Sequence, residues 1–100
     1  MLKIGYAEAD ITPIASVETV GFGRADNRSR GTLQPLLAQV TVWEKDGLCC
    51  LITIDSLGFH TDLSEKLREC ICRQLDISKE KVMLCFSHCH SAPNAAIEFE

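Results

Sequence analysis

The fold of this protein follows from the sequence LCCLITID at residues 48–55. Its nearly continuous apolar character predicts a strand that is buried on both faces of a sheet. Residues 36–44, just before it, read LLAQVTVWE and are rich in β-branched and aromatic side chains, which favour a strand. The connection, Lys45-Asp46-Gly47, carries the Asp-Gly pair typical of a tight hairpin turn. We therefore expect the two runs to pair as an antiparallel hairpin.

After the hairpin, the chain is predicted to form a helix and a further strand. Thr61 or Asp62 can cap the helix, and Glu65 completes a partial capping box. From there to about Asp76, apolar residues recur at helical spacing. That stripe consists of Leu63, Leu67, Cys70, Ile71 and Leu75. A polar connection follows, and then residues 82–87, VMLCFS, which indicate a buried strand.

A strand, a helix and a strand in this order make a βαβ unit, whose crossover is right-handed in nearly all proteins. The strands that end at Asp55 and Ser87 are therefore predicted to be parallel. Their carboxyl ends then share one edge of the sheet, where open α/β sheets build their sites. Residues 3–11 add an N-terminal strand. The predicted fold class is α/β, with a mixed sheet in a single domain spanning residues 1–100.

Composition narrows the class of protein. An apolar content of 46% is ample for a core and excludes a disordered chain. A net charge of −4 leaves no basic patch for nucleic acid or an anionic membrane. No apolar run reaches the roughly 18 residues of a transmembrane segment, and no signal-peptide pattern is present, so we expect a cytoplasmic chain. Most of the six cysteines are then predicted to be small buried hydrophobic residues in a reducing compartment.

A polar loop at residues 21–31 carries Arg24, Arg28 and Arg30. Arginine suits carboxylate and phosphate groups, so the loop is a candidate for anion handling or substrate contact. The alternative is a solvated connection, and the sequence leaves both open. The loop lacks the strand-turn-helix context of a dinucleotide-binding fingerprint.

The candidate site is Ser87–Pro93, which holds two of the three histidines, His88 and His90. In an extended backbone both would point to one side and Cys89 to the other. Neutral imidazole is the commonest metal-binding side chain, so the pair is a candidate start of a metal site. A catalytic zinc usually takes three protein ligands, however. The alternative is that both imidazoles only form hydrogen bonds in a loop.

Four pieces of sequence occur along the chain in a recognisable order. They are Ala9-Asp10-Ile11-Thr12-Pro13, Gly21-Phe22, Ile54-Asp55-Ser56-Leu57-Gly58 and Ser87-His88-Cys89-His90-Ser91-Ala92-Pro93. With these spacings the chain resembles the N-terminal portion of the neutral/alkaline, non-lysosomal ceramidase family, from about Ile4 to Pro93. The last piece is similar to that family's zinc motif, His-Thr-His-Ser-Gly/Ala-Pro. The resemblance implies a zinc-dependent amidohydrolase that cleaves the N-acyl bond of ceramide-like lipids.

The resemblance also implies roles for individual residues. His88 corresponds to a zinc ligand, and His90 to a catalytic neighbour that binds or polarises the substrate carbonyl. The family's other ligands, a His, a Glu and a Tyr, come from much later in the sequence. We therefore expect a fragment of a larger catalytic domain, inactive alone and binding Zn²⁺ weakly. Asp55 either fixes the tautomer of His88 as an acceptor or caps the strand-end loop. His60 is expected at the helix entry rather than at the metal.

The chain departs from the family pattern in two places. Cys89 stands where the family usually has Thr, and we expect it to pack rather than to bind metal. Asn94-Ala95-Ala96 replaces a glycine-rich continuation. Ceramidases of the family are often exported, whereas this sequence shows no signal-peptide pattern, so we expect either a ceramide-like lipid or, in a cytosolic relative, another amide or ester as the substrate.

The competing interpretation is a small non-enzymatic α/β module. It would use Cys85, His88, Cys89 and His90 as a closed structural metal site or as an oligomer contact. The enzyme interpretation instead predicts both histidines beside an open cleft, with Cys89 turned inward. In a fragment, uncovered strand edges and apolar surface are also expected to favour self-association.

Overall fold

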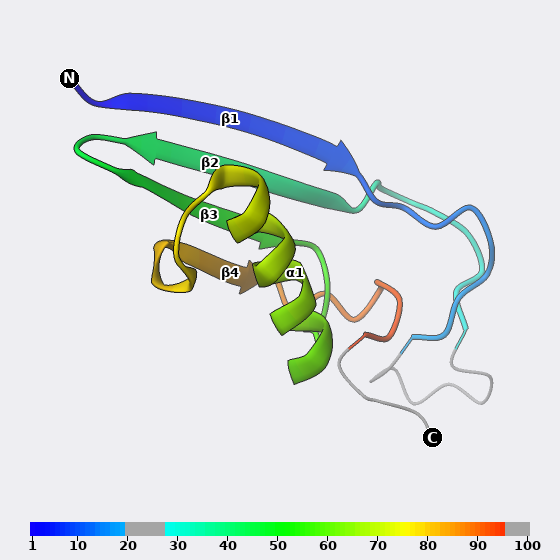
Figure 1. The fold of residues 1–100 in the computed structure, drawn as a ribbon. Coiled ribbons are helices and arrows are strands. Elements are labelled where there is room, and N and C mark those ends of the chain that lie inside the picture. Colours follow the sequence, from blue (N-terminus) through cyan, green and yellow to red (C-terminus); the bar gives the residue numbers. More distant parts are fainter. Residues whose placement is uncertain (20–27, 96–100) are drawn as a thin grey trace.

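A computed structural model of the chain describes residues 1–19 and 28–95 and contains a four-stranded sheet with one long helix (Figure 1). In chain order the elements are β1 (Lys3–Asp10), β2 (Leu37–Glu44), β3 (Leu48–Ile54), α1 (Thr61–Leu75), the short 3-10 helix η1 (Lys79–Lys81) and β4 (Val82–Phe86). The sheet order is β1-β2-β3-β4. The β1–β2 and β2–β3 pairs are antiparallel and the β3–β4 pair is parallel. The predicted mixed α/β fold, with a hairpin and a βαβ unit, is thus confirmed.

The hairpin turn has the geometry that its residues favour. Asp46 and Gly47 both have positive φ, 56° and 142°, which Asp and Gly tolerate best. The Lys45 N–H donates to the Gly47 carbonyl at 2.9 Å. The resulting register pairs Val42 with Cys50 and continues without a break along the hairpin. Alternate apolar residues of both strands therefore share one face of the sheet.

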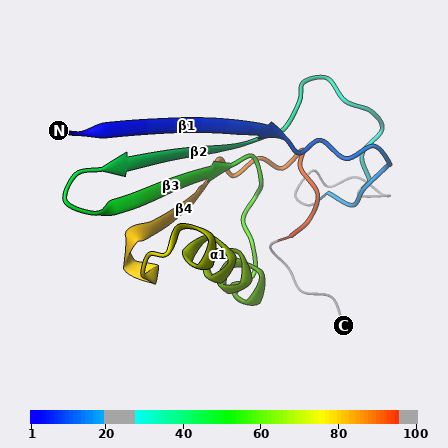
Figure 2. The same ribbon diagram turned by 45° about the horizontal axis from the view of Figure 1, so that its top comes forward.

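The helix covers only that face, as Figure 2 shows. The buried cluster there consists of Cys50, Ile52, Ile54 and Val82. The helix contributes Leu67, Ile71, Cys72 and Leu75 to the packing around it. In the part of the chain that the structure describes, no helix is long and apolar enough to cross a membrane.

The other face of the sheet lacks a second layer among the described residues. The prediction that β3 is buried on both faces is therefore wrong. Cys50, Ile52 and Ile54 are buried, whereas Leu51 is half-buried and Cys49 is exposed. An apolar run alone does not reveal how many layers will cover the strand.

The helix starts at a different cap from the one predicted. The N-cap residue is His60, whose Nδ1 accepts a hydrogen bond from the Leu63 N–H at 3.4 Å. His60 has an extended backbone and a ring acceptor at the correct distance, so Thr61 and Asp62 fall inside the first turn. The helix ends as predicted at Asp76, which adopts the left-handed conformation.

The cysteines are free and mostly not buried. Cys50 is buried, Cys49 and Cys70 are exposed, and Cys72, Cys85 and Cys89 are intermediate. The prediction that most of them are buried is therefore wrong. Cys70 lies off the contact stripe because that stripe is centred nearer Ile71, and Cys72 takes its place against the core.

Candidate functional site

The candidate site lies where β3 and β4 end side by side at one edge of the sheet. Their parallel register pairs Ile54 with Phe86. Beyond the strands, the Ser87 N–H donates to the Ile54 carbonyl at 3.1 Å, and the Cys89 N–H donates to the Ser56 carbonyl at 3.0 Å. The segments that leave the two strands therefore run together, which confirms the prediction that they share one edge.

The two imidazoles of the motif lie against each other. The ring centroids of His88 and His90 are 5.0 Å apart, in a T-shaped arrangement with an interplanar angle of 85°. Their proximity was predicted from an extended backbone, but the cause is different. The strand β4 ends at Phe86, and His88 has a φ of +65°, which residues other than glycine adopt infrequently. A turn therefore brings the rings together.

The ring of His88 also contacts a backbone carbonyl. Its Nδ1 lies 3.1 Å from the oxygen of Leu57, in the segment that follows β3. Because a carbonyl oxygen only accepts, this contact assigns the proton to Nδ1 in the neutral ring and leaves the lone pair of Nε2 available. Histidines that bind metals usually orient their other nitrogen in this way. The carbonyl of Leu57 is thus the acceptor for the His88 ring, the role that was expected for Asp55.

Asp55 instead forms hydrogen bonds with Leu37 of the neighbouring strand β2. Its carboxylate Oδ2 accepts from the Leu37 N–H at 2.9 Å, and its own N–H donates to the Leu37 carbonyl at 2.9 Å. These bonds extend the β2–β3 pairing beyond the end of β3. The printed bonds of Asp55 match neither predicted role, because its carboxylate completes the sheet edge at Leu37, whereas in the loop that follows it is the Ser56 hydroxyl that accepts from the Gly58 N–H.

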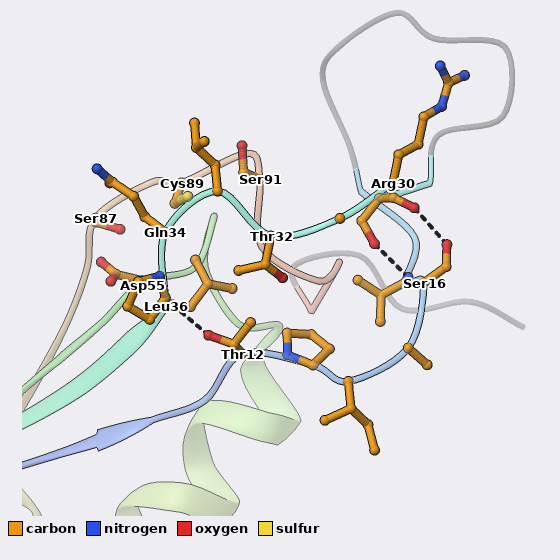
Figure 3. A pocket seen from close by; sticks show the side chains of 18 residues that line it. Thr12, Ser16, Arg30, Thr32, Gln34, Leu36, Asp55, Ser87, Cys89 and Ser91 are labelled. Atoms are coloured by element: carbon orange, nitrogen blue, oxygen red, sulfur yellow. Dashed lines mark hydrogen bonds between the residues drawn. The ribbon is translucent and has the colours of Figure 1, made fainter.

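A cleft of about 810 Å³ opens beside these strand ends (Figure 3). Two of its walls come from residues 12–17 and 29–36, which connect β1 to β2. The third wall consists of Asp55, Ser87, Cys89 and Ser91. The volume falls in the range of roughly 300–1,000 Å³ that small-molecule sites have.

The cleft is lined by Cys89 and not by the two histidines. Every second residue from Ser87 to Ser91 lines it, and the imidazoles alternate with these lining residues. The expected arrangement, with both histidines beside the cleft and Cys89 turned inward, is therefore reversed. The physical reason is that the positive φ of His88 and its contact with Leu57 hold the ring away from the cleft.

Hydrogen bonds between side chains and backbone hold the two connecting walls in place. The Thr12 hydroxyl accepts from the Leu36 N–H at 2.9 Å. The Ser29 hydroxyl accepts from the Val17 N–H at 2.9 Å, and the Ser16 hydroxyl donates to the Ser29 carbonyl at 2.8 Å. These serines and threonines therefore build the walls as well as line them.

The arginine loop divides into parts with different roles. Arg24 lies outside the described residues. Arg28 donates from Nη2 to the Ser16 carbonyl at 2.7 Å, which fastens the two walls together. Arg30 lines the cleft, but Figure 3 shows its side chain extending away from Asp55. The structure therefore gives Arg28 a structural role and leaves Arg30 as the arginine at the cleft.

The segment after the motif is tied to two distant parts of the chain. The His60 N–H donates to the Ala95 carbonyl at 2.8 Å, and the Asn94 N–H donates to the Glu18 carbonyl at 2.9 Å. Ala92, between the motif and these contacts, is buried. His60 thus stands at the helix entry, as predicted, and also anchors the segment that follows the histidines.

Sequence reasoning missed two features of this site. The carbonyl of Leu57 has no sequence signature, because every residue carries one. The cleft walls had a weak signal in the proline, glycine and hydroxyl residues of 12–16 and 29–35, which favour irregular backbone and side-chain capping.

The described residues do not form a complete metal site. No group of three or more His, Cys, Asp or Glu side chains among residues 1–19 and 28–95 could hold a metal ion. Cys85, His88, Cys89 and His90 therefore do not make the closed structural site of the competing interpretation. The two imidazoles amount to part of a site. No protein-family model, curated protein or solved structure matches the chain.

Proposed function

We propose that this chain forms the N-terminal part of a zinc-dependent amidohydrolase that cleaves an N-acyl amide bond. The observation that carries the proposal is the pair of imidazoles at the carboxyl edge of β3 and β4, with the Leu57 carbonyl against Nδ1 of His88. This geometry supports His88 as a zinc ligand through Nε2. The remaining ligands would come from outside the described residues, as the resemblance to neutral ceramidases implies.

The residues that are present fit part of a zinc site. Imidazole nitrogen is a common zinc ligand, and the Leu57 carbonyl supplies the outer contact that such ligands usually have. When bound, zinc supplies Lewis acidity toward the amide carbonyl and toward the attacking water. The half-buried imidazole of His90 would donate a hydrogen bond to the substrate oxygen on which negative charge develops.

The two imidazoles do not line the cleft, so the cleft would hold a part of the substrate that lies away from the reacting bond. Its walls suit an amphiphilic substrate, such as a ceramide-like lipid or a related N-acyl amide. Hydroxyl groups of Thr12, Ser87 and Ser91 line it and can bind a polar head. Ile14 and Leu33, also on the walls, are almost fully exposed, with relative exposures of 106% and 98%. Large apolar side chains in that position suit contact with an acyl chain.

A zinc titration of the chain, followed by NMR of the imidazole nitrogens, tests the metal part of the proposal. We expect the Nε2 resonance of His88 to respond first, and His88→Ala to remove the response. His60→Asn is the matched control, because it removes the third histidine but retains a good N-cap. A response of His60 that equals that of His88 would contradict the assignment.

Hydrolysis of a fluorescent N-acyl sphingosine, with and without Zn²⁺, tests whether zinc ligands from outside the described residues are needed for catalysis. We expect no turnover by the isolated chain, because one ligand and its neighbour do not complete a catalytic zinc site. Robust turnover that His88→Ala abolishes would show instead that the chain holds a whole site.

A further inference from the structure

We propose that the cleft beside the ends of β3 and β4 binds a neutral polyhydroxylated ligand, such as a sugar ring, with Asp55 and Ser87 at its centre. The lining of the cleft includes several polar groups that form no hydrogen bond within the described part of the chain. They are the second carboxylate oxygen of Asp55, Oδ1, and the side chains of Thr32, Gln34, Ser87 and Ser91. In small-molecule sites, a few such groups on a concave surface fix the orientation of the ligand.

Two of these groups stand together at the ends of neighbouring strands. Ile54 and Phe86 are the last paired residues of β3 and β4, and the Ser87 N–H donates to the Ile54 carbonyl at 3.1 Å. Asp55 and Ser87 therefore leave the sheet side by side. Figure 3 shows Gln34, from the wall that leads into β2, at the same end of the cleft. Three segments of the chain thus bring polar side chains to one place.

The carboxylate of Asp55 is held in position by the sheet. Its Oδ2 accepts from the Leu37 N–H at 2.9 Å, and the Asp55 N–H donates to the Leu37 carbonyl at 2.9 Å. An ionised carboxylate only accepts hydrogen bonds, so a partner for Oδ1 must donate one. A sugar hydroxyl can donate to Oδ1 and also accept from a protein hydroxyl or amide. Adjacent hydroxyls of one ring therefore match the mixture of groups that this cleft presents.

The walls of the cleft are fixed before any ligand binds. The hydrogen bonds of Thr12, Ser16 and Ser29 hold the two connecting walls in place. These three hydroxyls therefore act within the protein, whereas the hydroxyls of Thr32 and Ser91 are available to a ligand. A site that is ordered in advance loses less conformational entropy on binding.

The charges of the cleft favour a neutral ligand over an ion. Among the lining residues that the structure describes, Asp55 and Arg30 are the charged ones, and their formal charges cancel. Figure 3 shows the Arg30 side chain extending away from Asp55, so the two do not form one strongly charged end. Pro13, Ile14 and Leu33 add apolar surface to the walls, which suits the C–H groups of a sugar ring.

Neither imidazole lines the cleft, so sugar binding requires neither zinc nor hydrolysis. The further step, that the sugar is the head group of the amide substrate, rests on the proposed function. The two proposals can fail separately, because sugar binding is measured without zinc and zinc binding is measured without sugar.

Titration of the isotope-labelled chain with methyl glucoside, methyl galactoside and methyl mannoside, in the absence of Zn²⁺, tests the site. We expect at least one of them to shift the amide resonances of the cleft, with a dissociation constant of about 1 mM or above. Asp55→Asn should raise that constant about tenfold, because it removes a charge-assisted hydrogen bond and keeps an oxygen for the Leu37 N–H. Glu44→Gln is the matched control, because it removes the same charge at the opposite end of β2 from Leu37.

Ser87→Ala is the second variant. Its hydroxyl forms no hydrogen bond within the described residues, so its loss should leave the fold intact. We expect the dissociation constant to rise about fivefold, as for the loss of one neutral hydrogen bond. The amide spectrum of each variant checks that it is folded.

Ethanolamine and inorganic phosphate are the competing probes, for a cation site and an anion site respectively. Three results would overturn the proposal. The first is the absence of saturable shifts at the cleft with every methyl glycoside. The second is sugar binding that both Asp55→Asn and Ser87→Ala leave unchanged. The third is tighter binding of ethanolamine or phosphate than of any of the sugars.

Discussion

Asp55 and Leu37 exchange two hydrogen bonds at the edge of the sheet, one through a side chain and one through the backbone, each 2.9 Å long. The carboxylate of Asp55 takes the place of a carbonyl that the backbone no longer supplies after β3 ends. The loop that carries Leu57 starts from this point. Leu57, whose carbonyl contacts His88, lies two residues beyond Asp55 in this loop.

Replacing the carboxylate should destabilise the protein. We expect Asp55→Ala to lower the free energy of unfolding by about 1–2 kcal/mol, because the half-buried Leu37 N–H loses its acceptor. Asp55→Asn retains an oxygen acceptor and should cost less. Urea denaturation measures both variants. Equal stability of Asp55→Ala and the natural chain would show that the bond is dispensable.

The cap at His60 makes a second prediction. His60→Ala should lower the free energy of unfolding by about 1 kcal/mol, because the Leu63 N–H at the start of α1 loses its acceptor. His60→Asn should restore most of that loss, because asparagine is among the best N-cap residues. Urea denaturation monitored by the helical signal distinguishes them. If the two variants are equally destabilised, the ring is important for packing rather than for capping.

The cysteines should differ in their reactivity toward iodoacetamide. Burial raises the pKa of the Cys50 thiol, and the neighbouring thiols of Cys49 and Cys72 add to the rise. Less thiolate is then present at a given pH, and the buried sulfur is also shielded. We expect Cys49 and Cys70, which are exposed, to be alkylated first and Cys50 last. Peptide mapping over time gives the order, and early alkylation of Cys50 in the folded chain would contradict it.

Asp10 should titrate below an ordinary aspartate. Hydrogen bonds from the hydroxyl and the N–H of Thr12 lower the pKa of its carboxyl. The pKa is lower in the folded state, so this contribution to stability is present above the unfolded pKa and is lost as the pH falls through the folded pKa. Carboxyl NMR gives the midpoint, which Thr12→Val should raise. An unchanged midpoint in Thr12→Val would exclude the hydroxyl as a cause.

The hairpin and the βαβ unit could be predicted because their signals are local. The apolar runs have the length of strands, and Asp46-Gly47 favours the positive φ that the turn requires. The one-sided burial of β3 could not be predicted in the same way. Whether Cys49 and Leu51 are covered depends on the number of layers, and an apolar run is compatible with one or two.

The candidate site was predictable only in part. The spacing of His88 and His90 predicted two imidazoles on one side of an extended strand, and the rings do lie together, although β4 has already ended and His88 has a positive φ. The positive φ of His88 and the role of Leu57 depend on contacts between the segments that leave β3 and β4, and no residue type signals them. The same turn directs Cys89, rather than the two histidines, toward the cleft. The sequence therefore did not reveal this orientation.

The anchoring of Asn94 to Glu18 and of Ala95 to His60 has a consequence for how the molecule opens. These hydrogen bonds join segments that are far apart in the sequence, and they lie outside the sheet ladders. Such regions exchange their amide hydrogens through local fluctuations that leave the rest folded. The amides of Asn94 and His60 should therefore exchange earlier than that of Ile52 in β3. Loss of this tether would free the backbone after the histidines while the sheet persists, so the motif and the core have separable stabilities.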